Sequence, residues 1–341
     1  MRDFIVMVGL AGSGKSTLAN KFKESYSKLY CESDAFGVSN VADIISSDAI
    51  RGELLGDEND QSKNDLIFKE VHNRIKSSLK KHHHVIVDAT NINVKSRKSI
   101  IECLNCLTEE ERKEYRINAY VVSTPIALCY KQNASRDRKV PEYVIEKQLK
   151  KFEIPFYEEG FDNIFIEGWE RYYNKEYLLD KSLAPEATLN SIEIIIKAMD
   201  GVDQKNSHHK YDLGTHCRKS AEEVEKRTNN PILYRAALIH DIGKLYTGEP
   251  KEDGSGDYKY HSHHNVGTYH LLSNLDLFAF DKWEDTMDVL FYVNFHMTPF
   301  FMESDKSKEK WKKIFGEEKF NNLFLFNECD KIASGRERKK L

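Results

Sequence analysis

The feature that most constrains the fold is a glycine-rich stretch near the start of the chain. Residues 9–16 read GLAGSGKS, they follow the apolar run at residues 4–8 (FIVMV), and a helical pattern begins near Lys15. This is the order strand, glycine loop, helix, and the spacing fits the phosphate-binding pattern G-x-x-x-x-G-K-[ST]. Small residues there let successive backbone N–H groups surround a polyphosphate at a helix N-terminus.

The loop predicts binding of ATP or another nucleoside triphosphate together with Mg²⁺. Lys15 is expected to neutralise the β- and γ-phosphates, which makes it a catalytic candidate, and the Ser16 hydroxyl is expected to hold the Mg²⁺. The nucleotide-binding candidates in the loop are Gly12, Ser13, Gly14, Lys15, Ser16 and Thr17.

Length and composition narrow the classes of protein further. The chain has 341 residues, about twice a typical domain, so two domains are expected. A net charge of −4 excludes a strongly basic coat protein for nucleic acid, while leaving room for a local basic groove. The sequence shows neither a signal-peptide pattern nor an apolar run of about 20 residues, which predicts a soluble cytoplasmic protein with no membrane partner. The six cysteines are scattered, which indicates reduced thiols.

Charged residues follow the next predicted strand. Residues 43–48 (DIISSD) read as a short strand that ends on Asp48, and Arg51 follows one helical turn later. The carboxyl edge of an open α/β sheet is where ligands bind, so both side chains are expected beside the phosphate loop. Asp48 could then deprotonate an attacking hydroxyl, and Arg51 could hold a phosphate of the acceptor.

Two further strands extend this pattern. The strand at residues 85–88 (VIVD) ends on Asp88, a candidate for the water shell of the Mg²⁺, and Asn91 shortly after it is a candidate for substrate binding. A strand at residues 116–122 and a helix at residues 125–135 precede a basic turn with Arg136 and Arg138. Such a turn is typical of a lid whose arginines stabilise charge on the transferred phosphoryl group.

These motifs, with residues 159–162 (EGFD), resemble the 5′-hydroxyl polynucleotide kinase family of phosphate-loop kinases over about residues 1–170. The resemblance implies that Asp48 is the general base for the 5′-hydroxyl and that Arg51 contacts the phosphate beside the acceptor nucleoside. It also implies that Arg136 clamps the donor phosphates, with Arg138 as a second nucleotide-binding candidate. Related kinases of small molecules or of tRNA share part of this set.

The second half of the chain carries a different set of polar residues. Helical patterns dominate it, and six potential metal ligands occur on successive predicted helices: His216, His240, Asp241, His263, His296 and Asp330. Buried histidine and aspartate are costly to desolvate unless they are paired or metal-bound. Imidazole with carboxylate suits Mn²⁺, Fe²⁺, Co²⁺, Ni²⁺ or Zn²⁺ better than Ca²⁺.

The order H…HD…H…H…D, and above all residues 240–244 (HDIGK), resembles the HD phosphohydrolase superfamily, an all-helical fold, over about residues 186–341. The resemblance implies one metal bound by His216, His240, Asp241 and Asp330. It also implies that Asp241 bridges to a second metal held by His263 and His296. Lys244 is then a candidate for binding the substrate phosphate, and His209 for touching the substrate.

The sequence therefore predicts an α/β phosphate-loop kinase domain at residues 1–170, with a parallel sheet flanked by helices. A linker is expected at residues 171–185, where periodicity is weak, and an all-α HD domain at residues 186–341. The combination resembles bifunctional kinase-phosphatase repair enzymes, although the kinase comes first here, unlike in the HD-paired examples.

The expected function is healing of broken RNA or DNA ends for a separate ligase. The kinase would phosphorylate a 5′-hydroxyl, and the HD domain would remove a 2′,3′-cyclic, 2′- or 3′-phosphate. Two alternatives remain at this point: a nucleoside or small-molecule kinase fused to an HD nucleotidase, and a non-catalytic binding module switched by nucleotide.

Overall fold

The computed structural model divides the chain into two compact units. Residues Met1–Gln148 and Glu159–Gly168 form the first unit, and residues Leu149–Glu158 and Trp169–Leu341 form the second. The structure describes residues 1–32, 41–136, 138–167, 192–207, 209–277, 280 and 282–335. The predicted linker at residues 171–185 lies outside the described residues.

The first unit is built on a five-stranded sheet in which every pair of neighbouring strands is parallel. Its spatial order is β2-β3-β1-β4-β5. The strands are β1 (Arg2–Val8), β2 (Ala42–Ser46), β3 (His84–Asp88), β4 (Tyr115–Val122) and β5 (Asn163–Glu167). The central strand β1 is almost entirely buried, as expected when both faces of a parallel sheet are covered. All five strands end at the same edge, which is where the phosphate loop begins.

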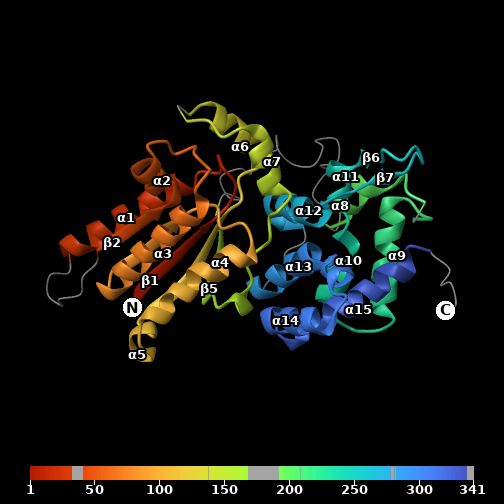
Figure 1. Cartoon of the computed structure of the whole chain (residues 1–341). Helices are drawn as coiled ribbons and strands as arrows, with labels where there is room; N and C mark the ends of the chain where they lie inside the picture. The colour runs from red at the N-terminus through yellow and green to blue at the C-terminus, as the bar shows by residue number, and fades with distance from the viewer. Residues whose placement is uncertain are drawn as a thin grey trace. The chain divides into compact units, whose positions relative to one another are not determined.

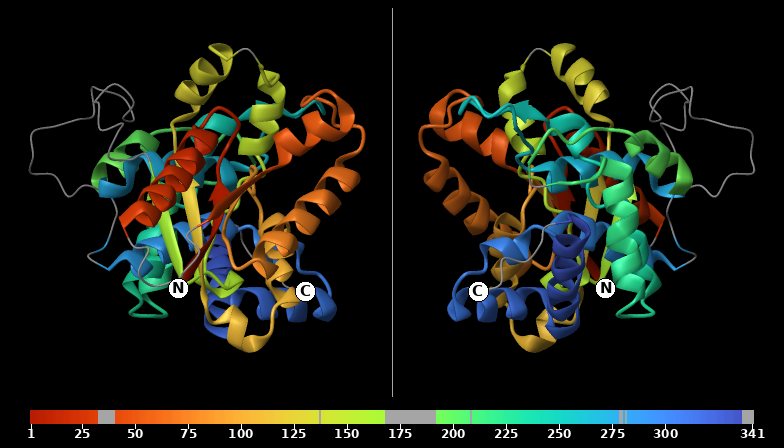
Figure 2. Two further views of the ribbon diagram at one scale, coloured as in Figure 1. Left: turned by 90° about the vertical axis from the view of Figure 1, so that its left-hand side faces the viewer. Right: turned by 90° about the vertical axis from the view of Figure 1, so that its right-hand side faces the viewer.

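Helices cover both faces of this sheet (Figures 1 and 2). Leu18 and Ala19 of α1 pack on the face that carries Ile5 and Met7, while α3 lies on the opposite face. The helical elements are α1 (Lys15–Glu32), α2 (Ser47–Leu55), α3 (Asn64–Lys80), α4 (Val94–Ile101), η1 (Glu102–Cys106), α5 (Glu109–Arg112), α6 (Ile126–Ala134) and α7 (Glu142–Leu149). The short helix η2 (Tyr157–Glu159) begins in the second unit and ends at the first residue of the returning segment of the first unit. The predicted α/β class with a parallel sheet flanked by helices is confirmed.

One element boundary differs from the sequence prediction. Strand β2 ends at Ser46, and Asp48 lies in the first turn of α2 instead of at the strand end. The Ser46 hydroxyl accepts a hydrogen bond from the Ala49 N–H at 3.3 Å, so Ser46 acts as the N-cap of that helix. The cap starts the helix two residues earlier than the strand pattern suggested.

The second unit is helical, as predicted. Its elements are α8 (Ile192–Met199), α9 (Leu213–Glu225), α10 (Pro231–Ile239), α11 (Lys244–Thr247), α12 (His263–Leu271), η4 (Leu272–Leu277), α13 (Trp283–Phe295), η5 (Thr298–Phe301), α14 (Asp305–Phe315) and α15 (Glu317–Ala333). A small antiparallel hairpin, β6 (Glu249–Pro250) with β7 (Tyr258–Lys259), adds to the helices. Within the described residues, no helix is both long and apolar enough to cross a membrane.

Residues Leu149–Glu158 form part of the second unit, and we call them the strap segment. Phe152 and Phe156 are 0% and 2% exposed. The Phe156 ring lies 5.1 Å from the Phe291 ring and 5.6 Å from the Phe315 ring, centroid to centroid. The Phe152 ring lies 5.1 Å from that of Tyr269. The strap therefore contributes aromatic side chains to the core of the HD-like unit, although it lies within the predicted first domain at residues 1–170.

This packing predicts a large loss of stability on truncation in the strap. Replacing Phe156 by Ala leaves a cavity among three aromatic rings and should lower the free energy of unfolding of the second unit by about 3–5 kcal/mol. The matched control is Phe301→Ala, because Phe301 is 70% exposed in the same unit. Chemical denaturation followed by tryptophan fluorescence measures both variants. Equal, small effects would show that the strap does not stabilise this unit.

Candidate active sites

The phosphate loop is held in place by hydrogen bonds from all sides. The Gly9 N–H donates to the Thr90 carbonyl at 3.0 Å, and the Thr124 hydroxyl donates to the Ser13 carbonyl at 2.7 Å. Gly12 has φ +81°, and a Cβ there would collide with the carbonyl oxygen of Cys129. Only glycine fits this position, so the loop conformation depends on the sequence pattern that predicted it.

Lys15 lies inside this loop as the sequence predicted. Its side chain is buried, and Nζ donates to the Leu10 carbonyl at 2.7 Å. Burial lowers the pKa of Lys15, while the carboxylates of Asp88 and Asp48 oppose that shift. The Ser13 hydroxyl is buried without a hydrogen-bond partner among the described residues, which suits a loop shaped to receive an acceptor such as phosphate. Ser16 and Thr17 are exposed at the start of α1.

Asp48 is placed between two arginines. Arg51 NH1 lies 2.6 Å from its Oδ1, and Arg138 NH1 lies 2.8 Å from its Oδ2. Partial burial raises the pKa of Asp48, but Arg138 and Arg51 outweigh it, and the net effect is a pKa below the usual value. The carboxylate is therefore ionised at neutral pH, as a general base must be.

The two lid arginines differ in their surroundings. Arg138 contacts Asp48, Glu58 and Asn59, whereas Arg136 is exposed. The positive charge of Arg136 nevertheless lowers the pKa of Lys15, so its guanidinium acts on the same loop. The structure places Arg138 beside Asp48, and contact of both arginines with the nucleotide stays a prediction.

Asn91 and Glu159 take part in a buried network. Asn91 is 2% exposed, has φ +45°, and donates from Nδ2 to the Met7 carbonyl at 2.8 Å. Arg97 is fully buried and contacts both carboxylate oxygens of Glu159, at 2.7 and 2.8 Å. Arg97 also donates to the Asn91 carbonyl at 3.2 Å. These contacts fix the loop after β3 against the end of β1, and no sequence spacing had pointed to Arg97.

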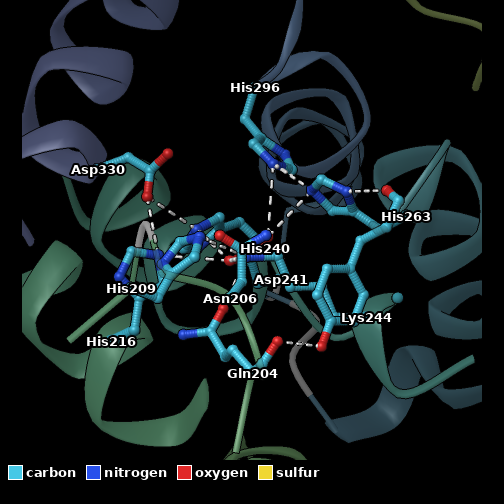
Figure 3. Close-up of polar contacts among 12 residues, drawn as sticks. Gln204, Asn206, His209, His216, His240, Asp241, Lys244, His263, His296 and Asp330 are labelled. Carbon is cyan, nitrogen blue, oxygen red and sulfur yellow. Dashed lines mark hydrogen bonds and ion pairs between the residues drawn. The ribbon is translucent and has the colours of Figure 1, made fainter. Parts of the chain in front are cut away.

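The six predicted metal ligands of the second unit come together (Figure 3). They lie on α9 (His216), at the C-terminus of α10 and in the turn after it (His240, Asp241), at the first residue of α12 (His263), at the C-terminus of α13 (His296) and on α15 (Asp330). Two groups each have ligand atoms within 4.8 Å of one another: His216, His240 and Asp241, and Asp241, His263 and His296.

Asp241 is common to both groups. Its Oδ2 lies 3.3 Å from His216 Nε2 and 3.4 Å from His240 Nε2, while its Oδ1 lies 3.0 Å from His263 Nε2. Asp330 closes the first group, with its Oδ1 2.9 Å from His216 Nε2. One carboxylate thus faces both groups with different oxygens, which is the arrangement a bridging ligand requires.

The backbone orients three of these histidines in the same way. The Nδ1 atoms of His240, His263 and His296 each lie 2.7–2.8 Å from the carbonyl oxygen of the residue three positions earlier. A proton on Nδ1 satisfies these contacts and leaves each Nε2 free as a ligand atom.

The donors fit a pair of divalent metals. His240 Nε2 and both ring nitrogens of His216 are buried without a partner in hydrogen-bond geometry among the described residues. Burial lowers the pKa of His216, yet Asp241 and Asp330 outweigh it and raise the pKa to about 9. The pKa of Asp241 falls well below its usual value despite burial, because Lys244 and His240 lie beside it. The cluster therefore holds its carboxylates ionised, as metal ligands must be.

A close contact between two glycines brings the two groups together. A Cβ on Gly243 would collide with the His263 carbonyl and would lie 2.7 Å from the Gly267 nitrogen. A Cβ on Gly267 would lie 2.8 Å from the Gly243 nitrogen. The glycine two residues after Asp241 thus lets α12 approach closely enough for His263 to reach that carboxylate.

Lys244 and His209 border the cluster. Lys244 Nζ lies 2.7 Å from Asp241 Oδ2, 2.8 Å from Gln204 Oε1 and 3.3 Å from His209 Nε2. Burial and the charge of Lys244 lower the pKa of His209 to about 3, so this ring is neutral at physiological pH. Gln204 is 2% exposed and was missed by sequence reasoning, since a glutamine upstream of a motif carries no spacing signal.

The shared carboxylate predicts how metal content responds to mutation. Asp241→Ala should remove both metals, because that residue faces both groups, whereas His263→Ala should retain the metal at the first group. Metal analysis of protein loaded with Mn²⁺ and then desalted measures the ratio of metal to chain. A full complement of metal in Asp241→Ala would rule out the bridging assignment.

Comparisons with known proteins divide the chain in the same way. Residues 4–155 match the model of a family described as AAA domain, and residues 207–334 match the model of the HD domain. The chain thus consists of a phosphate-loop domain that matches the AAA model, followed by a helical domain that matches the HD model.

A curated relative and a solved structure each match part of the chain. The L-seryl-tRNA(Sec) kinase of Methanococcus maripaludis is 28% identical over 151 residues, which cover 44% of this chain and 52% of that protein. The chain thus spans about half the length of this relative. A solved structure described as the Pnkp1/Rnl/Hen1 RNA repair complex aligns at 20% identity over 44% of this chain and 43% of that chain, with a TM-score of 0.31.

Proposed function

We propose that this protein heals the ends of broken nucleic acid, with a kinase in its first unit and a phosphoesterase in its second. The proposal rests mainly on the surroundings of Asp48. This carboxylate is ionised and forms an ion pair with Arg51, and its negative charge opposes the lowering of the pKa of Lys15 by burial in the phosphate loop. A loop that only bound nucleotide would have no use for a general base on the acceptor side.

In the kinase reaction, Asp48 accepts the proton of a 5′-hydroxyl as the hydroxyl oxygen attacks the γ-phosphorus of ATP. The bond from that phosphorus to the β,γ-bridging oxygen breaks, and ADP leaves. Arg51 binds the phosphate next to the acceptor nucleoside and orients that hydroxyl. Lys15 and Arg136 stabilise charge on the transferred phosphoryl group. The Ser16 hydroxyl would hold the Mg²⁺ that accompanies ATP, and Asp88 would bind its water shell. Arg138 keeps Asp48 ionised from the other side.

In the second unit, the six His and Asp ligands would hold two divalent ions, which would supply Lewis-acid stabilisation and activate a water. Lys244 binds the substrate phosphate, and neutral His209 contacts the substrate beside it. We propose a 2′,3′-cyclic, 2′- or 3′-phosphate at an RNA or DNA end as the substrate. Removing it complements 5′-phosphorylation and leaves ends that a separate ligase can join.

The curated relative supports an acceptor carried on RNA, because its name describes a kinase of an aminoacylated tRNA. The alternative is a nucleoside or small-molecule kinase joined to an HD nucleotidase. The same active-site residues would serve both, so the substrate must be tested directly.

The test uses oligonucleotides with defined ends. We expect transfer of the γ-phosphate of ATP to a 5′-hydroxyl end in preference to a free nucleoside, and hydrolysis of a 2′,3′-cyclic phosphate end with Mn²⁺, Co²⁺ or Ni²⁺. RNA and DNA versions of each oligonucleotide are compared, and both ends are analysed after the reaction. Turnover of nucleosides and mononucleotides with both polynucleotide ends untouched would favour the alternative.

Variants of the first unit should separate the two activities. Lys15→Ala and Asp48→Ala should each abolish phosphorylation and leave phosphoesterase activity nearly intact, because the two sets of residues lie in separate units. Arg136→Ala should lower the kinase rate by about 10³-fold or more, the size expected for an arginine that stabilises the transition state. Arg138→Ala should cost less, and steady-state kinetics measure all four. Near-normal phosphorylation by Asp48→Ala would refute the general-base role.

A further inference from the structure

The seam between α12 and α13 carries two polar contacts in register. His263 Nε2 and His296 Nε2 lie 3.1 Å apart. Asn265 follows His263 by two residues on α12, and Asn294 precedes His296 by two residues on α13. Asn294 Nδ2 donates to Asn265 Oδ1 at 3.0 Å. These are successive contacts of one antiparallel helix pair, so the amide pair and the metal-ligand pair report the same register.

The backbone of the strap segment forms hydrogen bonds with both asparagine side chains. Asn294 Oδ1 accepts from the Ile154 N–H at 2.8 Å, and Asn294 Nδ2 also donates to the Phe152 carbonyl at 3.2 Å. Asn265 Nδ2 donates to the Lys150 carbonyl at 2.9 Å. Asn294 is 0% exposed and Asn265 is 9% exposed. Both side chains thus form hydrogen bonds with each other and with the strap backbone.

We propose that Asn265 and Asn294 are positioning residues for the second metal, and that they set the register of α12 against α13 through the strap. A slide of one residue along a helix moves a side chain by about 1.5 Å. A metal–ligand distance tolerates about 0.2 Å. The helix pair must therefore be held far more precisely than apolar packing requires.

The physical reason is the difference between apolar and polar contacts. Phe291 and Phe295 of α13 pack against Phe156 of the strap through rings, and such contacts change gradually as helices slide. A buried amide that loses its partner costs about 1–3 kcal/mol at once. The two asparagines thus favour one register of α12 against α13. They do so two residues away from the His263–His296 pair on each helix.

The experiment titrates nucleotide-free, full-length protein with Mn²⁺ and follows free Mn²⁺ by electron paramagnetic resonance. The variants are Asn294→Ala and Asn265→Ala. The matched control is Asn274→Ala, since Asn274 is 4% exposed in the same unit and donates to the His270 carbonyl at 3.0 Å, as a buried amide capping α12. Thermal unfolding of each metal-free variant reports the purely structural cost.

We expect Asn294→Ala and Asn265→Ala each to lower the affinity for the second Mn²⁺ by about 10–100-fold. This is the loss of affinity typical when groups that orient metal ligands are removed. The first Mn²⁺ should stay within about threefold of wild type, and Asn274→Ala should lower the unfolding temperature without changing either affinity. If Asn294→Ala does not fold, Asn265→Ala decides alone, because it removes a side chain nearer the surface.

The inference rests on the proposed metal centre, and the titration separates the two. If the wild-type protein binds no Mn²⁺, the proposed metal centre is refuted, and this inference is refuted with it. Two Mn²⁺ ions in wild type with unchanged affinities in both variants would overturn the inference alone. An equal loss of both ions in the variants and in Asn274→Ala would also overturn it, because it would show a general structural effect.

Discussion

The second unit depends on the burial of one negative charge. Asp241 is 2% exposed, and a carboxylate moved out of water is costly unless cations or donors surround it. Lys244 is provided by α11, and four histidines are provided by α9, α10, α12 and α13. The helices therefore have to converge at this point, and the Gly243–Gly267 contact permits the approach of α12.

The first unit also buries a charge, but here the charge is positive. Lys15 is buried inside a loop of backbone dipoles, and Asp88 and Asp48 offset the cost of its charge. Asp48 in turn is balanced by Arg51 and Arg138. The charges of Lys15, Asp48 and the two arginines are thus linked through neighbouring residues. Loss of Arg138 therefore changes the surroundings of Asp48, and through Asp48 those of Lys15.

Much of this could be read from the order of residues along the chain. The phosphate loop is local, and its glycine, lysine and serine positions predict a conformation that the structure shows. The six His and Asp residues were recognisable because their order matches a known pattern, and the structure brings them together. For Asn91 the structure adds a contact that no spacing could reveal, because its Nδ2 donates to the Met7 carbonyl. Its contact with substrate stays a prediction.

The sequence by itself determined the two folds, the phosphate loop and the set of candidate ligands, because these depend on local spacing and on periodic burial. Only the tertiary structure decided which side chains support them. Arg97 pairs with Glu159 across 62 positions, Lys244 meets Gln204 across 40, and Ile154 binds Asn294 across 140. Such pairs form where separate elements pack, and a single sequence carries no periodic signal for contacts over those separations.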